Sequence, residues 1–292
     1  MGKKPLIIYH GQCIDGFTAA WVFWCLHGDR AEYFAAQYGV AGGPVELPDV
    51  TGHDVVMVDF CTSREQLLEL KAKARSLRVL DHHKTAEAAC AGLDFCTFDM
   101  ERSGARLAWD FCVAIADTWG WATPVPDRAA GIPDAEAPPW LVSYVEDRDL
   151  WRFKLPLSKA INAFVSAHPM TFEAWHVVAD ASRGQAARSG EVVLAYIDRY
   201  VDEMCKQARP LCFAGHDSIP VVNAPYINIS ELVGKLAESS LFAVGWFQRG
   251  DGLYQYSLRS RGDFDVSALA KRFGGGGHKN AAGFTSSVLV HE

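Results

Sequence analysis

Two adjacent histidines preceded by an aspartate, Asp81-His82-His83, form the residue group in this sequence that is best suited to chemistry. They follow Leu77, Val79 and Leu80, which predict a short buried strand. Successive side chains of a strand point in opposite directions, so His83 would point the same way as Asp81 and His82 the other way if the strand continued. One imidazole can then bind a metal ion while the other faces a substrate.

Two further apolar segments end at polar side chains in the same manner. Residues 6–9 predict a strand that stops at His10, and the turn that follows contains Cys13 and Asp15. Residues 55–58 predict a strand that stops at Asp59. Predicted helices at 17–27 and from 63 onward separate the three strands, and such crossovers produce a parallel sheet. The carboxyl-terminal edge of that sheet is where open α/β folds bind their ligands.

The polar groups at these strand ends predict a metal site. Carboxylates that lie close together repel one another, and divalent cations relieve the repulsion. A mixed set of aspartates and histidines suits Mn²⁺, and paired metal ions are a known solution for phosphoryl hydrolysis. Alternatively, the histidines are ordinary loop residues and the aspartates cap helices, but repetition of the pattern at three strand ends favours metal. The candidate residues are four carboxylates, three imidazoles and one thiol: His10, Cys13, Asp15, Asp59, Asp81, His82, His83 and Asp147.

A run of four glycines, residues 274–277, precedes His278 and is a second candidate binding feature. Backbone N–H groups of glycines can approach an anionic ligand closely. His278, with Arg259 or Arg261 from the preceding predicted strand, would complete a phosphate cradle. The alternative is a flexible connection in which His278 starts a helix. The residues expected to contact the substrate are Arg259, Gly276, Gly277 and His278.

The remaining pattern predicts two α/β domains, of which the first has a mostly parallel sheet with helices on both faces and the second is smaller. Residues 186–207 have the spacing of a long amphipathic helix, which Pro210 ends and which we expect to join the domains. We therefore expect a metal-binding domain at 1–185, a linker helix at 186–209 and a substrate-binding domain at 210–292. Other predicted elements are helices at 107–116, 140–145, 231–238 and 265–273, a loop at 120–139, an acidic and aromatic turn at 146–151, and strands at 211–213, 219–222, 241–246 and 253–257.

Composition limits the partners and the cellular location. The chain has 292 residues, a net charge of -7 and 49% hydrophobic residues, as in an ordinary globular protein. The acidic balance argues against long duplex nucleic acid, which would require a basic surface. The apolar run near the N-terminus is too short for a signal peptide or a membrane span, so we expect a cytoplasmic protein without membrane contact. Its eight cysteines form no Cys-x-x-Cys pair and are expected to be mostly reduced core thiols.

Taken together, these motifs resemble the DHH superfamily of phosphoesterases with its glycine-rich C-terminal partner domain, and the resemblance covers nearly the whole chain. Members of that superfamily include manganese-dependent single-strand exonucleases, nano-RNases, phosphatases of nucleotide bisphosphates, linear-dinucleotide phosphodiesterases and pyrophosphatases. The motifs that carry the resemblance are the turn at 10–16, Asp59, Asp81-His82-His83, the acidic residues near Asp147, and residues 274–278 with 281–283.

The resemblance implies a role for each candidate residue. His10 and Asp59 would hold one metal ion, and Asp59 would bridge to a second. His83 would face the scissile phosphate, and Asp81 would orient a histidine. The ligands of the second metal ion would be Asp15, Asp59, His82 and Asp147.

Two positions leave alternatives open. Asp149 competes with Asp147, which we favour because Trp151 follows it four residues later, as is usual in the family. Cys13 stands where the family has an aspartate. A thiolate favours Zn²⁺ or Fe²⁺ over Mn²⁺, so the first metal site either differs or is weak; alternatively, Cys13 packs beneath the loop and contacts no metal.

The sequence thus predicts a metal-dependent phosphoesterase, with two Mn²⁺ ions as cofactors and Zn²⁺ or Fe²⁺ as the alternative at Cys13. The proposed mechanism is attack on phosphorus by a water activated between two metals. Expected substrates are short single-stranded oligonucleotides or nucleotides, held through a terminal phosphate by the second domain. A homodimer is compatible with the sequence. The alternative from another class is a non-catalytic nucleotide-binding module with an impaired first metal site.

Overall fold

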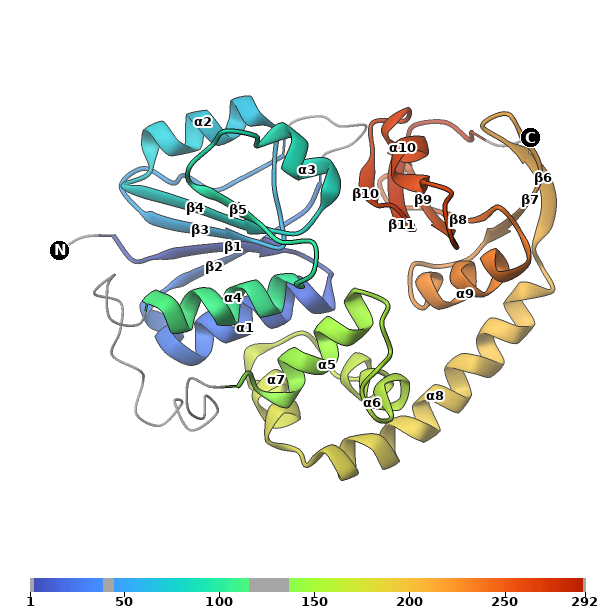
Figure 1. Cartoon of the computed structure of the whole chain (residues 1–292), viewed down its shortest axis with the longest axis horizontal. Helices are drawn as coiled ribbons and strands as arrows, with labels where there is room; N and C mark the ends of the chain where they lie inside the picture. The colour runs from blue at the N-terminus through green and yellow to red at the C-terminus, as the bar shows by residue number, and fades with distance from the viewer. Residues whose placement is uncertain (1–2, 39–44, 116–136, 291–292) are drawn as a thin grey trace. The chain divides into compact units, whose positions relative to one another are not determined.

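The computed structural model of the chain describes residues 3–38, 45–115 and 137–290, which form two compact units (Figure 1). The described residues of the first unit lie within 3–37 and 45–194, and those of the second are Tyr38 and residues 195–290. The division falls inside the long helix α8 (Arg183–Cys205), which continues from one unit into the other. Residues 120–136 of the predicted loop, and Ala116 at the end of a predicted helix, lie outside the described residues.

The first unit contains the predicted parallel sheet. Its five strands are all parallel and have the order β2-β1-β3-β4-β5. Strands β2 and β5 and helix α3, which the sequence patterns did not predict, complete this layer. The strands are β1 (Leu6–His10), β2 (Glu32–Ala36), β3 (Asp54–Val58), β4 (Ser76–Asp81) and β5 (Cys96–Phe98), and the helices on the two faces are α1 (Ile14–His27), α2 (Arg64–Lys73), α3 (Lys84–Ala89) and α4 (Gly104–Ile115).

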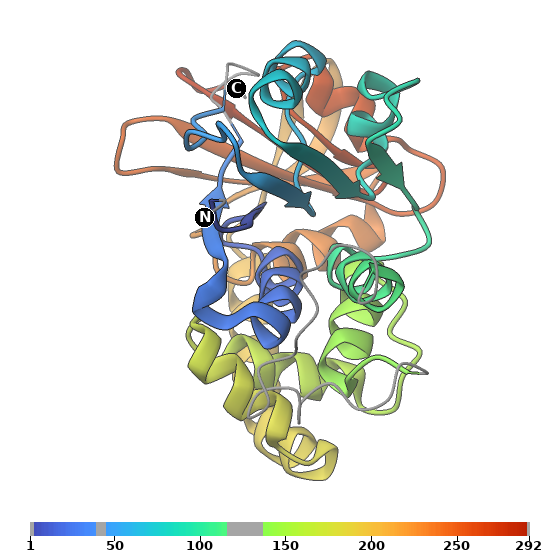
Figure 2. The ribbon, with the colours of Figure 1, turned by 90° about the vertical axis from the view of Figure 1, so that its left-hand side faces the viewer.

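Helices cover both faces of this sheet, as predicted. Figures 1 and 2 show α1 and α4 on one face and α2 and α3 on the other. Side chains of one strand alternate between the two layers: Val56 packs with the α1 and α4 side, and Met57 packs with the α2 side. Because strand β3 is buried on both faces, its sequence is apolar apart from its first residue.

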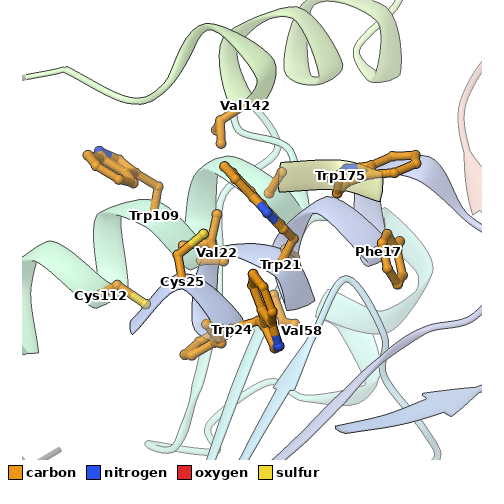
Figure 3. Close-up of a cluster of buried hydrophobic side chains, with 14 of the residues drawn as sticks. Phe17, Trp21, Val22, Trp24, Cys25, Val58, Trp109, Cys112, Val142 and Trp175 are labelled. Atoms are coloured by element: carbon orange, nitrogen blue, oxygen red, sulfur yellow. The ribbon is translucent and has the colours of Figure 1, made fainter. Parts of the chain in front are cut away.

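A helical layer follows α4 in the first unit. It consists of α5 (Trp140–Asp149), α6 (Ser158–Ser166), α7 (Phe172–Asp180) and the start of α8. Figure 3 shows how Trp175 of α7 and Val142 of α5 approach the tryptophans of α1 in one buried cluster. The Trp175 indole N–H donates to Thr18 Oγ1 at 3.0 Å, which satisfies its polar atom inside the core. This cluster fixes α1 and α5, and both helices carry residues of the candidate site.

One local prediction in this layer was wrong. Residues 146–149 belong to the last turn of α5 rather than to an acidic turn that begins at Glu146. The helix continues because the Leu150 N–H still donates to the carbonyl of Glu146 at 3.0 Å. The change of direction comes later, at Trp151 and Phe153, which both have positive φ angles.

The second unit contains a six-stranded sheet with the order β10-β11-β9-β8-β7-β6. All neighbours are antiparallel except β7 and β8, which are parallel. The glycine run leads into a short strand, β10, and not into a flexible connection with a helix. The elements are β6 (Arg209–Phe213), β7 (His216–Asn223), α9 (Ile229–Leu236), β8 (Phe242–Gln248), β9 (Tyr254–Ser260), α10 (Val266–Lys271), β10 (Gly276–His278) and β11 (Ala281–Ser286). Among the described residues, a short 3-10 helix also lies at Ala237–Ser239 in this unit and another at Gly28–Arg30 in the first unit.

The observed α/β class, with a parallel sheet between helices and a second, smaller α/β unit, confirms the fold predicted from the sequence. Among the described residues, no helix has both the length and the apolar character needed to span a membrane.

Candidate metal centre and active site

The carboxyl ends of three adjacent strands bring the polar side chains of the sequence pattern together. Strand β1 ends at His10, β4 ends at Asp81, and Asp59 directly follows β3. Because β1, β3 and β4 are neighbours in the sheet, these three ends lie side by side. The first helical turn of α1 and the end of α5 contribute the other residues of the site.

Asp59 occupies the centre of the site. Its Oδ1 is 3.0 Å from His82 Nε2, and its Oδ2 is 3.5 Å from His10 Nδ1. Burial alone would raise the pKa of Asp59, but the imidazoles of His10 and His82 outweigh it and hold the pKa well below its ordinary value. Its φ angle is +52°, a strained conformation that Asp tolerates better than most residues. Asp59 is thus a buried carboxylate held between two imidazoles.

Asp15 is held by the N-terminus of α4. Its Oδ2 accepts a hydrogen bond of 2.6 Å from the Gly104 N–H, and its Oδ1 accepts one of 3.0 Å from the Ala105 N–H. A helix N-terminus favours negative charge. Nevertheless, burial and the neighbouring carboxylates of Asp149 and Asp59 raise the pKa of Asp15 well above its ordinary value. The two amides position this carboxylate without fully compensating its charge.

The structure distinguishes the two competing aspartates of α5. Asp149 Oδ2 lies 3.6 Å from His82 Nε2. Asp147 instead accepts hydrogen bonds from the backbone N–H groups of Lys154 at 2.9 Å and Leu155 at 3.2 Å. Both oxygens of Asp147 therefore hold the loop that follows α5. The geometry therefore favours Asp149 as the candidate metal ligand, in place of Asp147, which the sequence favoured.

Two neighbouring sets of potential metal ligands lie at this end of the sheet. Their donor atoms lie within 4.8 Å of one another in each set: His10, Cys13 and Asp59 in the first, and Asp15, His82 and Asp149 in the second. The contact between Asp59 and His82 joins the sets. Asp59 Oδ2 and Asp149 Oδ2 are buried and accept no hydrogen bond from the part of the chain that the structure describes. Because buried carboxylate oxygens without donors are unfavourable, these residues fit divalent cations.

His82 supplies the positive charge of the site when no cation is bound. Burial opposes its protonation, but the hydrogen bond to Asp59 and the charges of Asp149, Asp59 and Asp15 raise the pKa of His82 to about 10. An imidazole must be neutral to bind a metal ion, so a cation would replace this proton.

Cys13 lies directly before α1 and belongs to the first donor set. Burial, followed by the charges of Asp59, Asp149 and Asp15, raises the pKa of its thiol well above the ordinary value. The thiol therefore stays protonated unless a cation compensates the charge. Its place beside His10 and Asp59 is compatible with ligation.

Asp81 orients the two histidines that follow it. Its Oδ1 lies 2.7 Å from His83 Nδ1 and accepts hydrogen bonds from the backbone N–H groups of His82 at 2.7 Å and His83 at 3.3 Å. Although burial lowers the pKa of His83, the charge and hydrogen bond of Asp81 raise it overall. The Nδ1 contact fixes the ring, so that chemistry at His83 falls to its Nε2 atom.

Two glycines allow this close packing, and the sequence patterns did not identify their role. A Cβ atom on Gly104 would lie 2.3 Å from Asp59 Cβ and 2.9 Å from Asp15 Oδ2. A Cβ atom on Gly16 would lie 2.4 Å from the His10 carbonyl oxygen and 3.0 Å from Asp59 Oδ2. The local signals were the position of Gly104 three residues before a predicted helix and that of Gly16 at the end of the turn at 10–16.

In the second unit, the glycine strand places His278 on the same sheet face as Arg259. His278 pairs with Ala281 on β11, and Ala281 pairs with Arg259 on β9. Directly opposed residues of antiparallel strands point to the same face, so the small Ala281 side chain lies between the imidazole and the guanidinium. Arg259 donates to Ser230 Oγ at 2.6 Å, whereas Arg261 pairs with Glu238 at 2.7 Å. The geometry favours Arg259 over Arg261 as the partner of His278.

Gly276 and Gly277 shape the same edge of this sheet. Gly276 pairs with Gly283 on the face that carries His278, which leaves that part of the face without side chains. Gly277 has a φ of +136°, and a Cβ atom there would lie 2.5 Å from the Ala281 carbonyl oxygen. A side chain is therefore excluded at Gly277 by close strand pairing.

Comparison with known proteins finds one matching domain family, one relative in sequence and several similar structures. Residues 222–289 match the DHHA1 domain family. Over 320 residues the chain is 27% identical to the uncharacterized protein R106 of Acanthamoeba polyphaga mimivirus, covering 98% of this chain and 68% of that protein. The structure is similar to RecJ from Thermus thermophilus, solved with Mn²⁺, with a TM-score of 0.52 and 15% identity over 97% of this chain and 49% of RecJ. A lower TM-score of 0.47, with 11% identity, relates it to the pGpG-specific phosphodiesterase PggH of Vibrio cholerae over 98% of this chain and 94% of that one.

The RecJ likeness establishes the fold, and the chain spans about half of that larger protein. Residues 222–289 thus match a DHHA1 domain and the fold is similar to that of RecJ, and both findings support the resemblance to the DHH superfamily found in the sequence.

Proposed function

We propose that the protein is a metal-dependent phosphoesterase that hydrolyses short oligonucleotides or nucleotides. The observation that carries this proposal is the position of Asp59, a buried carboxylate that adjoins both donor sets and has one oxygen without a hydrogen-bond donor among the described residues. A carboxylate shared by two adjacent metal sites is suited to phosphoryl hydrolysis. The presence of Mn²⁺ in the RecJ structure is compatible with the same metal here.

His10, Cys13 and Asp59 would hold one divalent ion, and Asp15, Asp59, His82 and Asp149 would hold the other. Such ions supply Lewis acidity and an activated water. The chain itself contributes position: the α4 amides fix Asp15, and the buried sheet end fixes Asp59.

Asp81 and His83 would act on the phosphate. Asp81 keeps the His83 ring in one orientation and favours its protonated form. A protonated imidazole can stabilise negative charge that develops on phosphoryl oxygens during attack. Residues 158–166 and the tryptophan cluster around α1 hold α5, and hence Asp149, in place.

We propose that the sheet face with His278 and Arg259 binds a phosphate group of the substrate. An imidazole and a guanidinium on one face, next to glycines that expose the backbone, suit an anionic ligand. On this proposal, His278→Ala impairs hydrolysis of a 5′-phosphorylated dinucleotide more than hydrolysis of a small chromogenic phosphodiester. Equal losses on both substrates would contradict phosphate binding by His278.

The central test is Asp59→Asn, since asparagine keeps the shape of the side chain and tolerates the positive φ angle. We expect turnover of both substrates at saturating Mn²⁺ to fall below about a hundredth of the wild-type value, because losing even an outer partner of a metal ligand typically lowers activity by 10–100-fold. Asp110→Asn, an isosteric change on the exposed side of α4, is the matched control and should retain activity. If Asp59→Asn keeps a tenth of the activity, the shared-carboxylate assignment is wrong.

The same assay distinguishes the second candidate function, a non-catalytic nucleotide-binding module. Cys13 motivates this candidate, because a protonated thiol in the first donor set weakens binding of hard metal ions. A protein that binds nucleotides but hydrolyses none of them with Mn²⁺, Zn²⁺ or Fe²⁺ would support the binding module and refute the enzyme.

A further inference from the structure

Three cysteines on the α2 and α3 side of the first sheet lie together, outside the two donor sets. Cys61 follows β3, Cys90 ends α3, and Cys96 begins β5. The Sγ atoms of Cys61 and Cys90 are 3.4 Å apart, and Cys90 also interacts with the thiol of Cys96. Cys61 and Cys90 are buried in the same apolar cluster, whereas Cys96 is partly exposed. The three thiols therefore form a chain that runs from the surface into the core.

The central thiol has the surroundings of a thiolate. Hydrogen bonds from Cys61 and Cys96 lower the pKa of Cys90 to about 4, despite the opposing effect of burial. The hydrogen bonds of Arg64 give independent evidence from geometry: its guanidinium donates to the carbonyls of Ala89 and Ala91, at 3.2 and 2.8 Å. The cation is therefore bound to the backbone on both sides of Cys90. A thiolate next to a cation and two thiols is the arrangement that favours reaction with peroxides.

We infer that Cys61 and Cys90 are a reversible disulfide site that forms on oxidation by hydrogen peroxide. The Cys90 thiolate attacks one peroxide oxygen, the O–O bond breaks, and hydroxide leaves as Cys90 becomes a sulfenic acid. The Cys61 thiol then attacks the Cys90 sulfur, the S–O bond breaks, and water leaves as the S–S bond forms. The two sulfurs together lose two electrons to the peroxide. A dithiol reductant returns both thiols and is itself oxidised to a disulfide.

The crosslink would connect two segments that begin at the metal site. Cys61 is two residues after Asp59, and Cys90 ends the helix that His83 precedes. A disulfide bond is about 2 Å long, so the two sulfur atoms must approach by about 1.4 Å from their observed separation. We therefore expect the disulfide to displace Asp59. This expectation rests on the proposed function, and it implies that hydrolysis falls roughly a hundredfold, the effect typical of an ångström-scale misplacement.

Peptide mapping tests the site without reference to activity. The full chain is treated with millimolar hydrogen peroxide, remaining thiols are alkylated, and peptides are mapped without reduction. We expect a peptide pair joined through Cys61 and Cys90, a loss of two hydrogens in intact mass, and reversal by dithiothreitol. Cys90→Ser should abolish the crosslink, and Cys112→Ala, a buried thiol in the other layer, should leave it intact. Unchanged thiols, or oxidation of Cys90 that stops at an irreversible sulfinic acid, would overturn the proposal.

Hydrolysis is measured on the same samples. A crosslink that forms without affecting turnover would overturn the regulatory effect but keep the disulfide site. A preparation with no hydrolysis in either redox state would count against the proposed enzyme, while the peptide map would still report on the cysteines. Wild type that loses activity on oxidation, alongside a Cys90→Ser variant that keeps it, is the result expected.

Discussion

Gly104→Ala is the sharpest test of how the first unit builds the metal site. The added methyl would lie 2.3 Å from Asp59 Cβ and 2.9 Å from Asp15 Oδ2. Ordinary carbon–carbon contacts are about 3.5 Å, so Asp59 and the start of α4 must separate by about 1.2 Å. Overpacking of this kind typically destabilises a protein by about 1–3 kcal/mol. The Gly104 N–H that binds Asp15 would move with the helix, so both carboxylates are displaced.

The expected result is a catalytic loss greater than the loss of stability explains. We predict that Gly104→Ala lowers turnover of a small phosphodiester roughly a hundredfold and weakens Mn²⁺ binding, as measured by titration calorimetry, while the protein remains folded at 25 °C by circular dichroism. Gly184→Ala is the matched control, because its methyl would lie at an ordinary 3.5 Å from Arg188 on helix α8. Wild-type metal affinity and turnover in Gly104→Ala would refute the claim that this glycine sets the position of Asp59.

Three further predictions address single groups. Asp149→Asn should weaken metal binding at least about tenfold in calorimetric titration. Asp147→Asn should retain metal binding but lose about 1–2 kcal/mol of stability in urea unfolding, because the new amide N–H would face a backbone N–H. The reverse pattern would identify Asp147 as the ligand. Cys13→Asp should shift bound metal from Zn²⁺ or Fe²⁺ towards Mn²⁺ and raise Mn²⁺-dependent turnover, and unchanged metal content by elemental analysis would exclude Cys13 as a ligand. Burial and the nearby Arg30 lower the pKa of His27 to about 4, so below about pH 6.5 the unfolded chain binds a proton that the folded chain does not, and the stability of the fold falls. His27→Gln should remove about 2 kcal/mol of the difference in unfolding free energy between pH 8 and pH 5. An unchanged difference would contradict the lowered pKa.

The strand ends could be predicted from the sequence because each combines two local signals. Residues 6–9 and 55–58 are apolar runs of strand length that stop at His10 and Asp59, and Leu77, Val79 and Leu80 predict a strand that stops at the Asp81 group. Parallel connection through helices then leaves one common edge, so convergence follows from topology alone. By contrast, β5 has only three residues, which is too short for an alternating pattern to distinguish it from a loop.

The choice between Asp147 and Asp149 shows where local reasoning ends. The two residues are two positions apart on α5, so they point about 200° apart around the helix axis. Spacing to Trp151 cannot decide which one faces the sheet, because that depends on how α5 packs against α1 and α4. The same limit applies to Asp15, whose amide partners on α4 are 89 and 90 residues away in the sequence.

The site also shows why its strain is compatible with a stable fold. Asp59 has a positive φ angle, and its neighbours Gly16 and Gly104 lack side chains that would otherwise fill the space around its carboxylate. Both features are unfavourable in isolation, and the surrounding structure compensates them: β3 is buried on both faces, and α1 is fixed by the tryptophan cluster. Because that scaffold is rigid, the carboxylates cannot move apart to relieve their repulsion. The repulsion that raises the pKa of Asp15 is therefore retained in the folded state, and a bound cation would remove it and stabilise the fold by its binding free energy.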